Sequence, residues 1–310
     1  MRPINENHTI NENRQSTGHV ALFYPKRFYS NPQTMETNPY QHDNDEAEIR
    51  RITKRAQAEI LDLQDALIEK GVVVTMLPGE PECPDCIFSG NWVSTLPDGT
   101  ACLFPMQAPN RRAERTPHLV KAIARHYEIA QDYSLEEGKG RFLEATGSLV
   151  LDHINKVAYS TLSKRTDEGL AREWCEKNGY RPVIFETAFE DGRPVYHTDL
   201  VMYIGTGYAV VSFEVMTEGA EEVRKSLEAS GLDIIEISRA QMNAMCGNAL
   251  EVIGYDGKRY VAMSSGAHDA LSDQQRKRLL GHIEGIIHAP VPTIEYYGGG
   301  SVRCLILEYF

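Results

Sequence analysis

Helix-start signals recur along this chain at intervals of about 50 residues, and this repeat constrains the fold more than any other feature. Thr116, Thr166, Thr217 and Ser272 each precede a helical stretch, where a hydroxyl side chain can cap the first turn. These starts are 50, 51 and 55 residues apart, and short β-type runs lie between them. The repeating unit is therefore two strands, one helix and one strand, which is typical of a ring or array of similar units.

The individual elements follow from apolar periodicity. Residues 44–70 repeat apolar side chains at intervals of three and four, which predicts one long helix, and residues 72–76 follow as a buried strand. The other expected helices are 118–126, 168–177, 219–230 and 274–280, and the other expected strands are 149–152, 157–160, 183–186, 201–204, 209–213, 234–237, 250–253 and 260–263. We expect a flexible N-terminal tail at residues 1–18 and a single α/β domain at residues 19–310. Chance spacing within an ordinary α/β domain is the alternative to a ring of about five units.

Composition excludes several function classes. The net charge of −12 argues against nucleic acid and anionic membranes as partners. No apolar run approaches the roughly 20 residues of a membrane span, and residues 1–18 lack the apolar core of a secretory signal. Six cysteines in such a chain favour free thiols in a reducing compartment, so we expect a cytoplasmic protein. The oligomeric state stays open, with a homodimer as one option.

Cys83 and Cys86 have the spacing of a metal-binding or redox pair. A structural zinc site needs four ligands, and the sequence offers no second close pair. A redox pair of this kind precedes a helix, whereas residues 87–93 read as a strand. We therefore expect no metal and no organic cofactor, and the role of the pair stays open.

The C-terminal segment Gly298-Gly299-Gly300-Ser301-Val302-Arg303-Cys304 carries the strongest functional signal. A run of glycines lets the backbone approach another group closely, so a thiol behind it can lie at the mouth of a cleft. Residues 305–307 then read as a short strand. The alternative is a tight turn leading to a buried structural cysteine, but that leaves the three glycines unexplained. Cys304 is therefore a candidate nucleophile.

Three other segments supply the remaining groups that covalent catalysis needs. They contain Asp85 with Asn91, Glu144, and His197 with Asp199. If residues 195–202 form a strand, His197 and Asp199 point to the same face. With Cys304, the set provides a nucleophile, a general base, a group that orients the base, and polar substrate ligands. The alternative is that each residue has only a structural role, which is the commoner fate of such residues taken singly.

These motifs are similar to those of the guanidine-modifying superfamily, which contains arginine deiminases, dimethylargininases and amidinotransferases. The resemblance covers residues 19–310 and rests on residues 31–34 with 38–41, 91–92, 146–152, 163–166, 197–199 and 298–304. It implies a five-fold pseudosymmetric α/β propeller, which agrees with the repeat. The motifs most resemble those of the citrulline-utilisation hydrolases, a branch once labelled amidinotransferase.

The resemblance implies a role for each catalytic candidate. Cys304 would attack the central carbon of a guanidine or urea. His197 would protonate the departing nitrogen and then activate water. Glu144 would orient His197 and stabilise its charged form, and Arg303 would support the loop that carries Cys304.

The same resemblance implies how a small amino-acid substrate is held. Asp199 would bind the reacting nitrogens, and Asp85 would bind the α-amino group. Arg165 would bind the α-carboxylate, a task that suits its planar fork, with Arg111 or Arg112 as weaker candidates.

The sequence departs from the superfamily at two positions. Asn91 stands where arginine and methylarginine hydrolases usually have a carboxylate, so only Asp199 remains to balance a cation. Because an amide offers both a donor and an acceptor, it matches a neutral urea, and we expect citrulline as the substrate. Ala145 stands where relatives often have glycine, which can perturb the backbone beside Glu144.

The sequence therefore predicts a cysteine-dependent hydrolase that cleaves the ureido C–N bond of citrulline to ornithine, carbon dioxide and ammonia. An arginine deiminase, a dimethylargininase and an amidinotransferase share the catalytic residues and stay open. A non-catalytic propeller that binds a partner is the alternative from another class, and the joint presence of Cys304, His197 and Glu144 argues against it.

Overall fold

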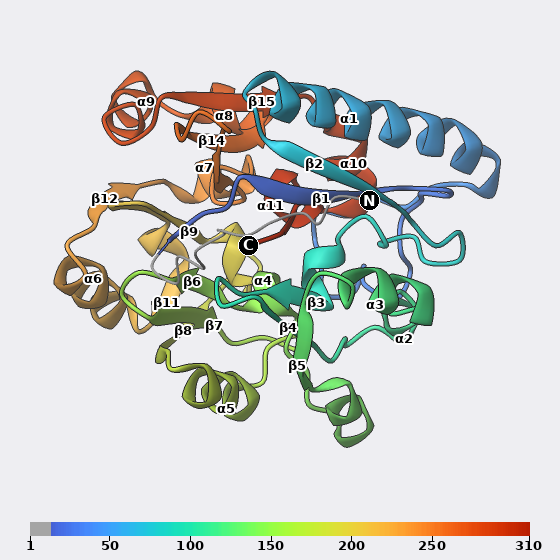
Figure 1. The fold of residues 1–310 in the computed structure, drawn as a ribbon, viewed down its shortest axis with the longest axis horizontal. Helices are drawn as coiled ribbons and strands as arrows, with labels where there is room; N and C mark the ends of the chain where they lie inside the picture. The colour runs from blue at the N-terminus through green and yellow to red at the C-terminus, as the bar shows by residue number, and fades with distance from the viewer. Residues whose placement is uncertain (1–13) are drawn as a thin grey trace, which may run out of the picture.

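The computed structural model describes residues 14–310, whose strands form five small sheets (Figure 1). In each sheet two strands pair antiparallel, and one of them also pairs with a parallel neighbour. The sheets contain β16 (Leu307–Glu308), β1 (His19–Tyr24) and β2 (Val73–Pro78); β3 (Val93–Thr95), β4 (Thr100–Leu103) and β5 (Glu128–Asp132); β6 (Val150–Asp152), β7 (Val157–Thr161), β8 (Arg181–Thr187) and β11 (Met216–Glu218); β9 (Met202–Gly205), β10 (Tyr208–Val211) and β12 (Asp233–Glu236); and β13 (Leu250–Ile253), β14 (Arg259–Ser264) and β15 (Gly285–Ala289).

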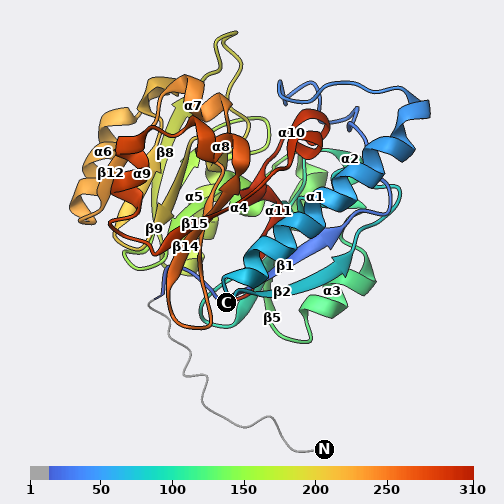
Figure 2. The ribbon, with the colours of Figure 1, turned by 90° about the horizontal axis from the view of Figure 1, so that it is seen from above.

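Each parallel pair is joined by a helical crossover, as parallel neighbours require. The crossover helices are α1 (Ile49–Glu69), α3 (Pro117–Ile123), α5 (Glu168–Asn178), α6 (Ala220–Ala229), and α8 (Ser265–Ala270) with α9 (Asp273–Leu279). Most of them lie at the periphery, whereas the one-turn helices α4 (Ala145–Ser148) and α11 (Val302–Leu305) lie near the centre (Figures 1 and 2). The remaining α-helices of the described chain are α2 (Pro109–Arg112), α7 (Arg239–Asn243) and α10 (Pro292–Gly298).

The predicted repeat of two strands, one helix and one strand is confirmed, and so is a single mixed α/β domain. The first unit is completed by both chain ends, since β16 pairs with β1. First strands of neighbouring units lie beside one another, with β9 between β6 and β13. Within residues 14–310 the five sheets are not hydrogen-bonded into a closed ring, and the five-fold propeller stays a prediction.

The long N-terminal helix is confirmed with a shorter span, because a 3-10 turn at Glu46–Glu48 precedes α1. Its apolar stripe is buried, and full burial of one aliphatic side chain contributes roughly 1.5–3 kcal/mol. The stripe consists of Ile49, Ile52, Ala56, Ile60, Leu63 and Leu67. Gly71, with φ of +80°, follows the helix end, where a left-handed residue favours glycine.

Two expected strands, at residues 87–93 and 195–202, are wrong and carry candidate site residues, and the strand expected at residues 305–307 begins later, as β16. His197 precedes a 3-10 turn at Thr198–Leu200, and β9 begins only at Met202. Ser89–Asn91 is likewise a 3-10 turn before β3, and residues 302–305 form α11 before the short β16. In each case the backbone turns just before the first strand of a unit, so His197 and Asp199 are not alternate residues of one strand.

The last residues of the expected N-terminal tail are packed against the domain. Residues 1–13 lie outside the described residues, but Gln15, Ser16 and Thr17 are buried. The Gln15 amide donates to the carbonyl oxygen of Leu151 at 2.8 Å, and the Ser16 hydroxyl donates to Glu251 at 2.7 Å. Polar side chains satisfied in this way can be buried at little cost, so the packed chain begins before residue 19.

His153 provides a test of the interior through pH. Burial, and then nearby cations, lower its pKa from 6.5 to about 3. The unfolded chain therefore binds a proton below pH 6.5 that the folded chain refuses until about pH 3, and stability falls as pH falls through this window. In His153→Gln, the loss of unfolding free energy between pH 6.5 and 5, measured by urea titration, should be about 2 kcal/mol smaller. The exposed His118→Gln is the control, and an unchanged slope in His153→Gln would contradict the assignment.

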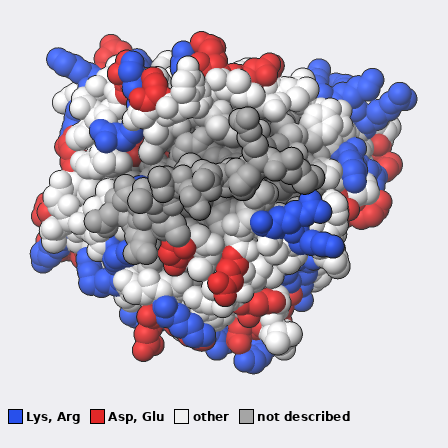
Figure 3. Space-filling model, in the orientation of Figure 1, with Lys and Arg blue, Asp and Glu red and all other residues white. Residues whose placement is uncertain are grey.

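Surface and thiol properties complete the fold. Among the described residues all six cysteines are free, as expected. On the face seen in Figure 3, acidic and basic side chains are interspersed around the rim. From residue 14 onward, none of the helices is both long and apolar enough to cross a membrane.

Candidate active site

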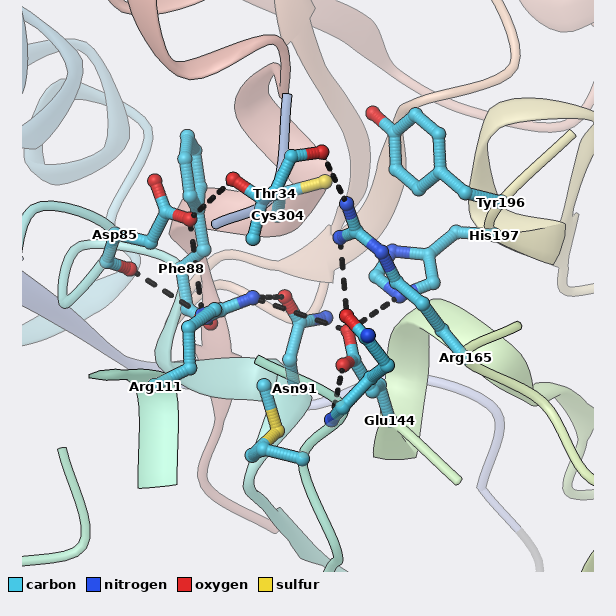
Figure 4. Close-up of polar contacts among 12 residues, drawn as sticks. Thr34, Asp85, Phe88, Asn91, Arg111, Glu144, Arg165, Tyr196, His197 and Cys304 are labelled. Atoms are coloured by element: carbon cyan, nitrogen blue, oxygen red, sulfur yellow. Dashed lines mark hydrogen bonds and ion pairs between the residues drawn. The ribbon is translucent and has the colours of Figure 1, made fainter. Parts of the chain in front are cut away.

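Five of the seven predicted site residues line one small pocket near the centre of the molecule (Figure 4). They are Asp85, Asn91, Arg165, His197 and Cys304. Glu144 lies behind His197, and Asp199 contacts Cys304 while lining a second cavity. The pocket encloses about 20 Å³, room for about one water molecule. The fold thus brings together side chains from distant parts of the sequence.

The repeat explains how they meet. One polar residue from each unit lies shortly before that unit's first strand: Asn91 before β3, Glu144 before β6, His197 before β9, Asn248 before β13 and Cys304 before β16. Successive members are 53, 53, 51 and 56 residues apart. Because the first strands lie side by side, the turns that precede them converge.

His197 and Glu144 form a buried pair. Glu144 Oε2 lies 2.9 Å from His197 Nε2, and its Oε1 accepts the backbone N–H of Gln107 at 3.0 Å. Burial alone opposes ionisation of Glu144, but the His197 hydrogen bond and the charges of Arg165 and Arg111 lower its pKa to about 2. An ionised Glu144 accepts a hydrogen bond from the imidazole and holds the ring in place.

Cys304 lies in a polar corner of the pocket, with 7% of its surface exposed. Its thiol donates to Asp199 Oδ2 at 3.3 Å, and its sulfur accepts an N–H from Asn248 at 3.1 Å. Burial, and then the Asp199 charge, raise the pKa of the thiol above its ordinary value. The sulfur is therefore protonated at rest and needs a base before it can react.

The orientation of the Asn91 amide is determined by Arg111. Arg111 donates to Asn91 Oδ1 at 2.8 Å, and a guanidinium has only donors, so the oxygen must face it. Asn91 Nδ2 then remains buried without a hydrogen-bond partner. It lies 2.7 Å from the position that a Cβ on Gly147 would occupy, and His197 Nδ1 lies 2.6 Å from the same position. The glycine keeps this space open between a fixed donor and the imidazole.

The two predicted ligands of an amino-acid head group, Asp85 and Arg165, also line the pocket. Asp85 Oδ2 accepts from Asn31 at 2.7 Å and from Thr34 at 3.2 Å, while Asp85 Oδ1 is buried without a partner. Arg165 donates to Thr37 at 2.7 Å and lies over the Tyr196 ring. Both groups are thus tied to the segment at residues 31–37.

The weaker arginine candidates differ from Arg165 in their surroundings. Arg111 is buried, and its Nε donates to Glu114 at 2.9 Å. This arginine is therefore held in place as part of the pocket wall. Arg112 donates to the backbone of Met106 and Gln107 and does not line the pocket. Arg303 pairs with Glu308 at 2.8 Å, which agrees with the expected support of its loop.

Ala145 is strained, as its departure from the superfamily pattern suggested. Its φ is +36°, a region that costs an L-residue roughly 1–2 kcal/mol. In Ala145→Gly, relief of this strain should exceed the added entropy of glycine and raise the unfolding free energy by about 1 kcal/mol in urea denaturation. The control is Ala171→Gly inside α5, which should be destabilising. Equal destabilisation by both substitutions would contradict the strain.

Sequence reasoning missed Asn248 and the supporting residue Glu114, and it assigned no contact to Asn31, which lies in one of the motifs of the resemblance. The repeat contained the signal for Asn248, because the fourth unit was the one without an assigned residue before its first strand. Glu114 carries no such signal, although its partner Arg111 is only three residues away. The contact of Asn31 with Asp85 joins residues 54 positions apart and comes from the tertiary structure.

Known proteins resemble this chain in sequence and in fold. Residues 24–310 match the family model described as N,N dimethylarginine dimethylhydrolase, eukaryotic. None of the curated proteins matches the chain.

Several solved structures are similar. The N-terminal domain of ArgZ, a cyanobacterial arginine dihydrolase crystallised with its substrate, has a TM-score of 0.74 at 15% identity, covering 94% of this chain and 97% of that one. A mutant of AgrE in complex with L-arginine has a TM-score of 0.74 at 16% identity, covering 94% and 40%. A dimethylarginine dimethylaminohydrolase adduct has a TM-score of 0.62 at 18% identity, covering 94% and 99%.

At these identities the solved structures establish the common fold, while the family model spans nearly the whole chain. The protein therefore belongs to the N,N-dimethylarginine dimethylhydrolase family, and through it to the guanidine-modifying arginine deiminase and amidinotransferase superfamily.

Proposed function

We propose that this protein hydrolyses the ureido C–N bond of free citrulline, with Cys304 as nucleophile and His197 as general acid and base. The observation that carries this proposal is the buried, unpartnered Nδ2 of Asn91. Arg111 occupies the amide oxygen, so Asn91 can offer the pocket only a donor. A ureido group presents a carbonyl oxygen to such a donor, whereas a guanidinium has only N–H groups.

Asp199 complements this donor. Its Oδ2 accepts the thiol proton of Cys304 at 3.3 Å and becomes free once that proton leaves. It can then accept an N–H of the substrate while Asn91 Nδ2 donates to the ureido oxygen. This pattern matches a urea at both ends, and the Asn91 hydrogen bond strengthens as the oxygen gains charge in the transition state.

The α-amino end of citrulline fits beside Asp85. The free Oδ1 of Asp85 is an acceptor for an ammonium group, and Arg165, which lines the same pocket, suits a carboxylate. The pocket as it stands has room for about one water molecule, so it has to widen for citrulline to enter. The segment at residues 31–37 contacts both Asp85 and Arg165 and is the part whose movement would widen the pocket there.

The reaction balances with these groups. His197 takes the Cys304 proton, and the thiolate attacks the ureido carbon. Protonated His197 gives its proton to the δ-nitrogen, ornithine leaves, and the carbamoyl group stays on the sulfur. Neutral His197 then takes a proton from water, and the hydroxide attacks the thioester carbon. Carbamate leaves and decomposes to ammonia and carbon dioxide, and the thiolate recovers its proton.

Hydrolysis of arginine or a methylarginine is the second candidate, and the buried charges favour it. Around the pocket, four carboxylates (Asp85, Glu114, Glu144 and Asp199) face two arginines (Arg111 and Arg165). Burial raises the pKa of Asp85 and Asp199, and a cationic substrate would stabilise their ionised forms. The names of the matching family and of ArgZ point to the same substrates.

A substrate panel decides between them. The protein is incubated separately with citrulline, arginine and Nω-methylarginines, and ornithine, citrulline and ammonia are measured. Ornithine formed from citrulline supports the proposal, whereas turnover of arginine or methylarginine without turnover of citrulline replaces it by the second candidate. Turnover that depends on added glycine or lysine would indicate an amidinotransferase.

A further inference from the structure

Asn248 contacts the reacting sulfur, and it is fully buried. Its Nδ2 donates to Cys304 Sγ at 3.1 Å and to the backbone oxygen of Asp199 at 3.2 Å. Its Oδ1 accepts the backbone N–H of Cys304 at 3.4 Å. The backbone donor and the backbone acceptor together leave only one orientation for this amide, so an N–H faces the sulfur.

We propose that Asn248 is a catalytic residue that stabilises the Cys304 thiolate through this N–H, an inference that rests on the proposed role of Cys304. Within residues 14–310 it is the only side chain that donates a hydrogen bond to this sulfur. Hydrogen bonds to ionised groups are about twice as strong as neutral ones, so the contact favours the reactive form.

The neighbourhood of Cys304 creates the need for such a donor. When the thiol ionises, the S–H···O bond to Asp199 is lost and two negative charges face each other across 3.3 Å. Burial and this charge both raise the thiol pKa, while the Asn248 hydrogen bond lowers it. The neutral amide of Asn248 stabilises the thiolate without adding a positive charge, which would compete with the substrate for Asp199.

The backbone around Asn248 fixes the position of this residue next to Cys304. A Cβ on Gly247 would overlap the carbonyl oxygen of Leu200, so only glycine lets this segment approach the turn that carries Asp199. The backbone N–H of Asn248 bonds to Met245, whose φ is +65°. This closely packed turn gives the fourth unit its member of the central set, in register with Asn91, Glu144, His197 and Cys304 in the other units.

Alkylation of Cys304 by iodoacetamide tests the inference without relying on turnover. The rate is measured against pH, with Cys304 identified by peptide mass, in the wild type, Asn248→Ala and Asn248→Asp. The midpoint of the pH profile should rise by about one to two pH units in both variants. With citrulline, kcat at neutral pH should fall about 10- to 100-fold with KM little changed. Asn178→Ala, which removes an amide bound to the Trp174 backbone outside the pocket, should leave both unchanged.

Asn248→Asp keeps the acceptor for the Cys304 N–H and nearly the same shape, so it carries the test if Asn248→Ala does not fold. An unchanged alkylation midpoint in either folded variant overturns the role of Asn248. Failure of the proposed function is separate, because it would show as no citrulline turnover by the wild type, or as citrulline turnover retained without Cys304, whatever the alkylation profile.

Discussion

Replacing Cys304 with serine should lower citrulline turnover by roughly 10⁴-fold or more while leaving the fold intact. Sulfur and oxygen have similar sizes, and the serine hydroxyl can still donate to Asp199 and accept from Asn248, so stability should change little. Chemistry should stop because an alcohol ionises far less readily than a thiol in a buried site beside a carboxylate. Ornithine release and thermal unfolding of the same preparation measure the two effects.

Cys175→Ser provides the matched control. Cys175 is equally free and buried in α5, remote from the pocket, so its replacement tests the general cost of putting a hydroxyl in the interior. Cys175→Ser should lower the thermal stability of the protein and change citrulline turnover little. Turnover retained in Cys304→Ser would exclude the covalent mechanism, even if His197 and Glu144 proved essential.

Exchanging Asn91 for aspartate should reverse the substrate preference. In Asn91→Asp a carboxylate would meet Arg111 in place of the amide oxygen, and the donor aimed into the pocket would be lost. Citrulline would then face a second negative group, so its kcat/KM should fall about 100-fold. Binding of arginine should tighten about tenfold, because two carboxylates can now compensate its cation. Steady-state kinetics with both substrates measure the change.

Asn91→Ala separates the new charge from the lost amide. This variant should weaken citrulline turnover without improving arginine binding, since it removes the donor and supplies nothing in its place. If Asn91→Asp and Asn91→Ala depress both substrates equally, Asn91 does not determine substrate choice, and the argument for a ureido substrate fails.

Much of the fold could be predicted because it depends on local signals. The capping residues Thr116 and Thr166 with Asp167 mark real helix starts, and the apolar stripe of α1 is buried as the periodicity requires. The expected strands failed at the turns before β3, β9 and β16. A local pattern of polar and apolar residues predicts a strand. At these turns the polar side chains instead point into a pocket formed by distant segments, which the local pattern does not reveal.

In the candidate site, too, the sequence predicts which residues take part but not how they contact one another. Cys304, His197, Glu144, Asn91, Asp85 and Arg165 could be named from residue chemistry and resemblance, and the structure gathers them. The amide orientation of Asn91, the contact of Asn248 with the sulfur and the attachment of Arg165 to Thr37 could not be named.

The order of helices and strands and the identity of the reactive groups were therefore legible in the sequence, because capping, periodicity and side-chain chemistry are properties of neighbouring residues. Which atoms face one another was decided only by the tertiary structure. Hydrogen-bond direction, burial and the proximity of charges depend on groups that are far apart in the sequence, such as Cys304 and Asp199, and only the packing of the five units brings these groups within hydrogen-bond distance.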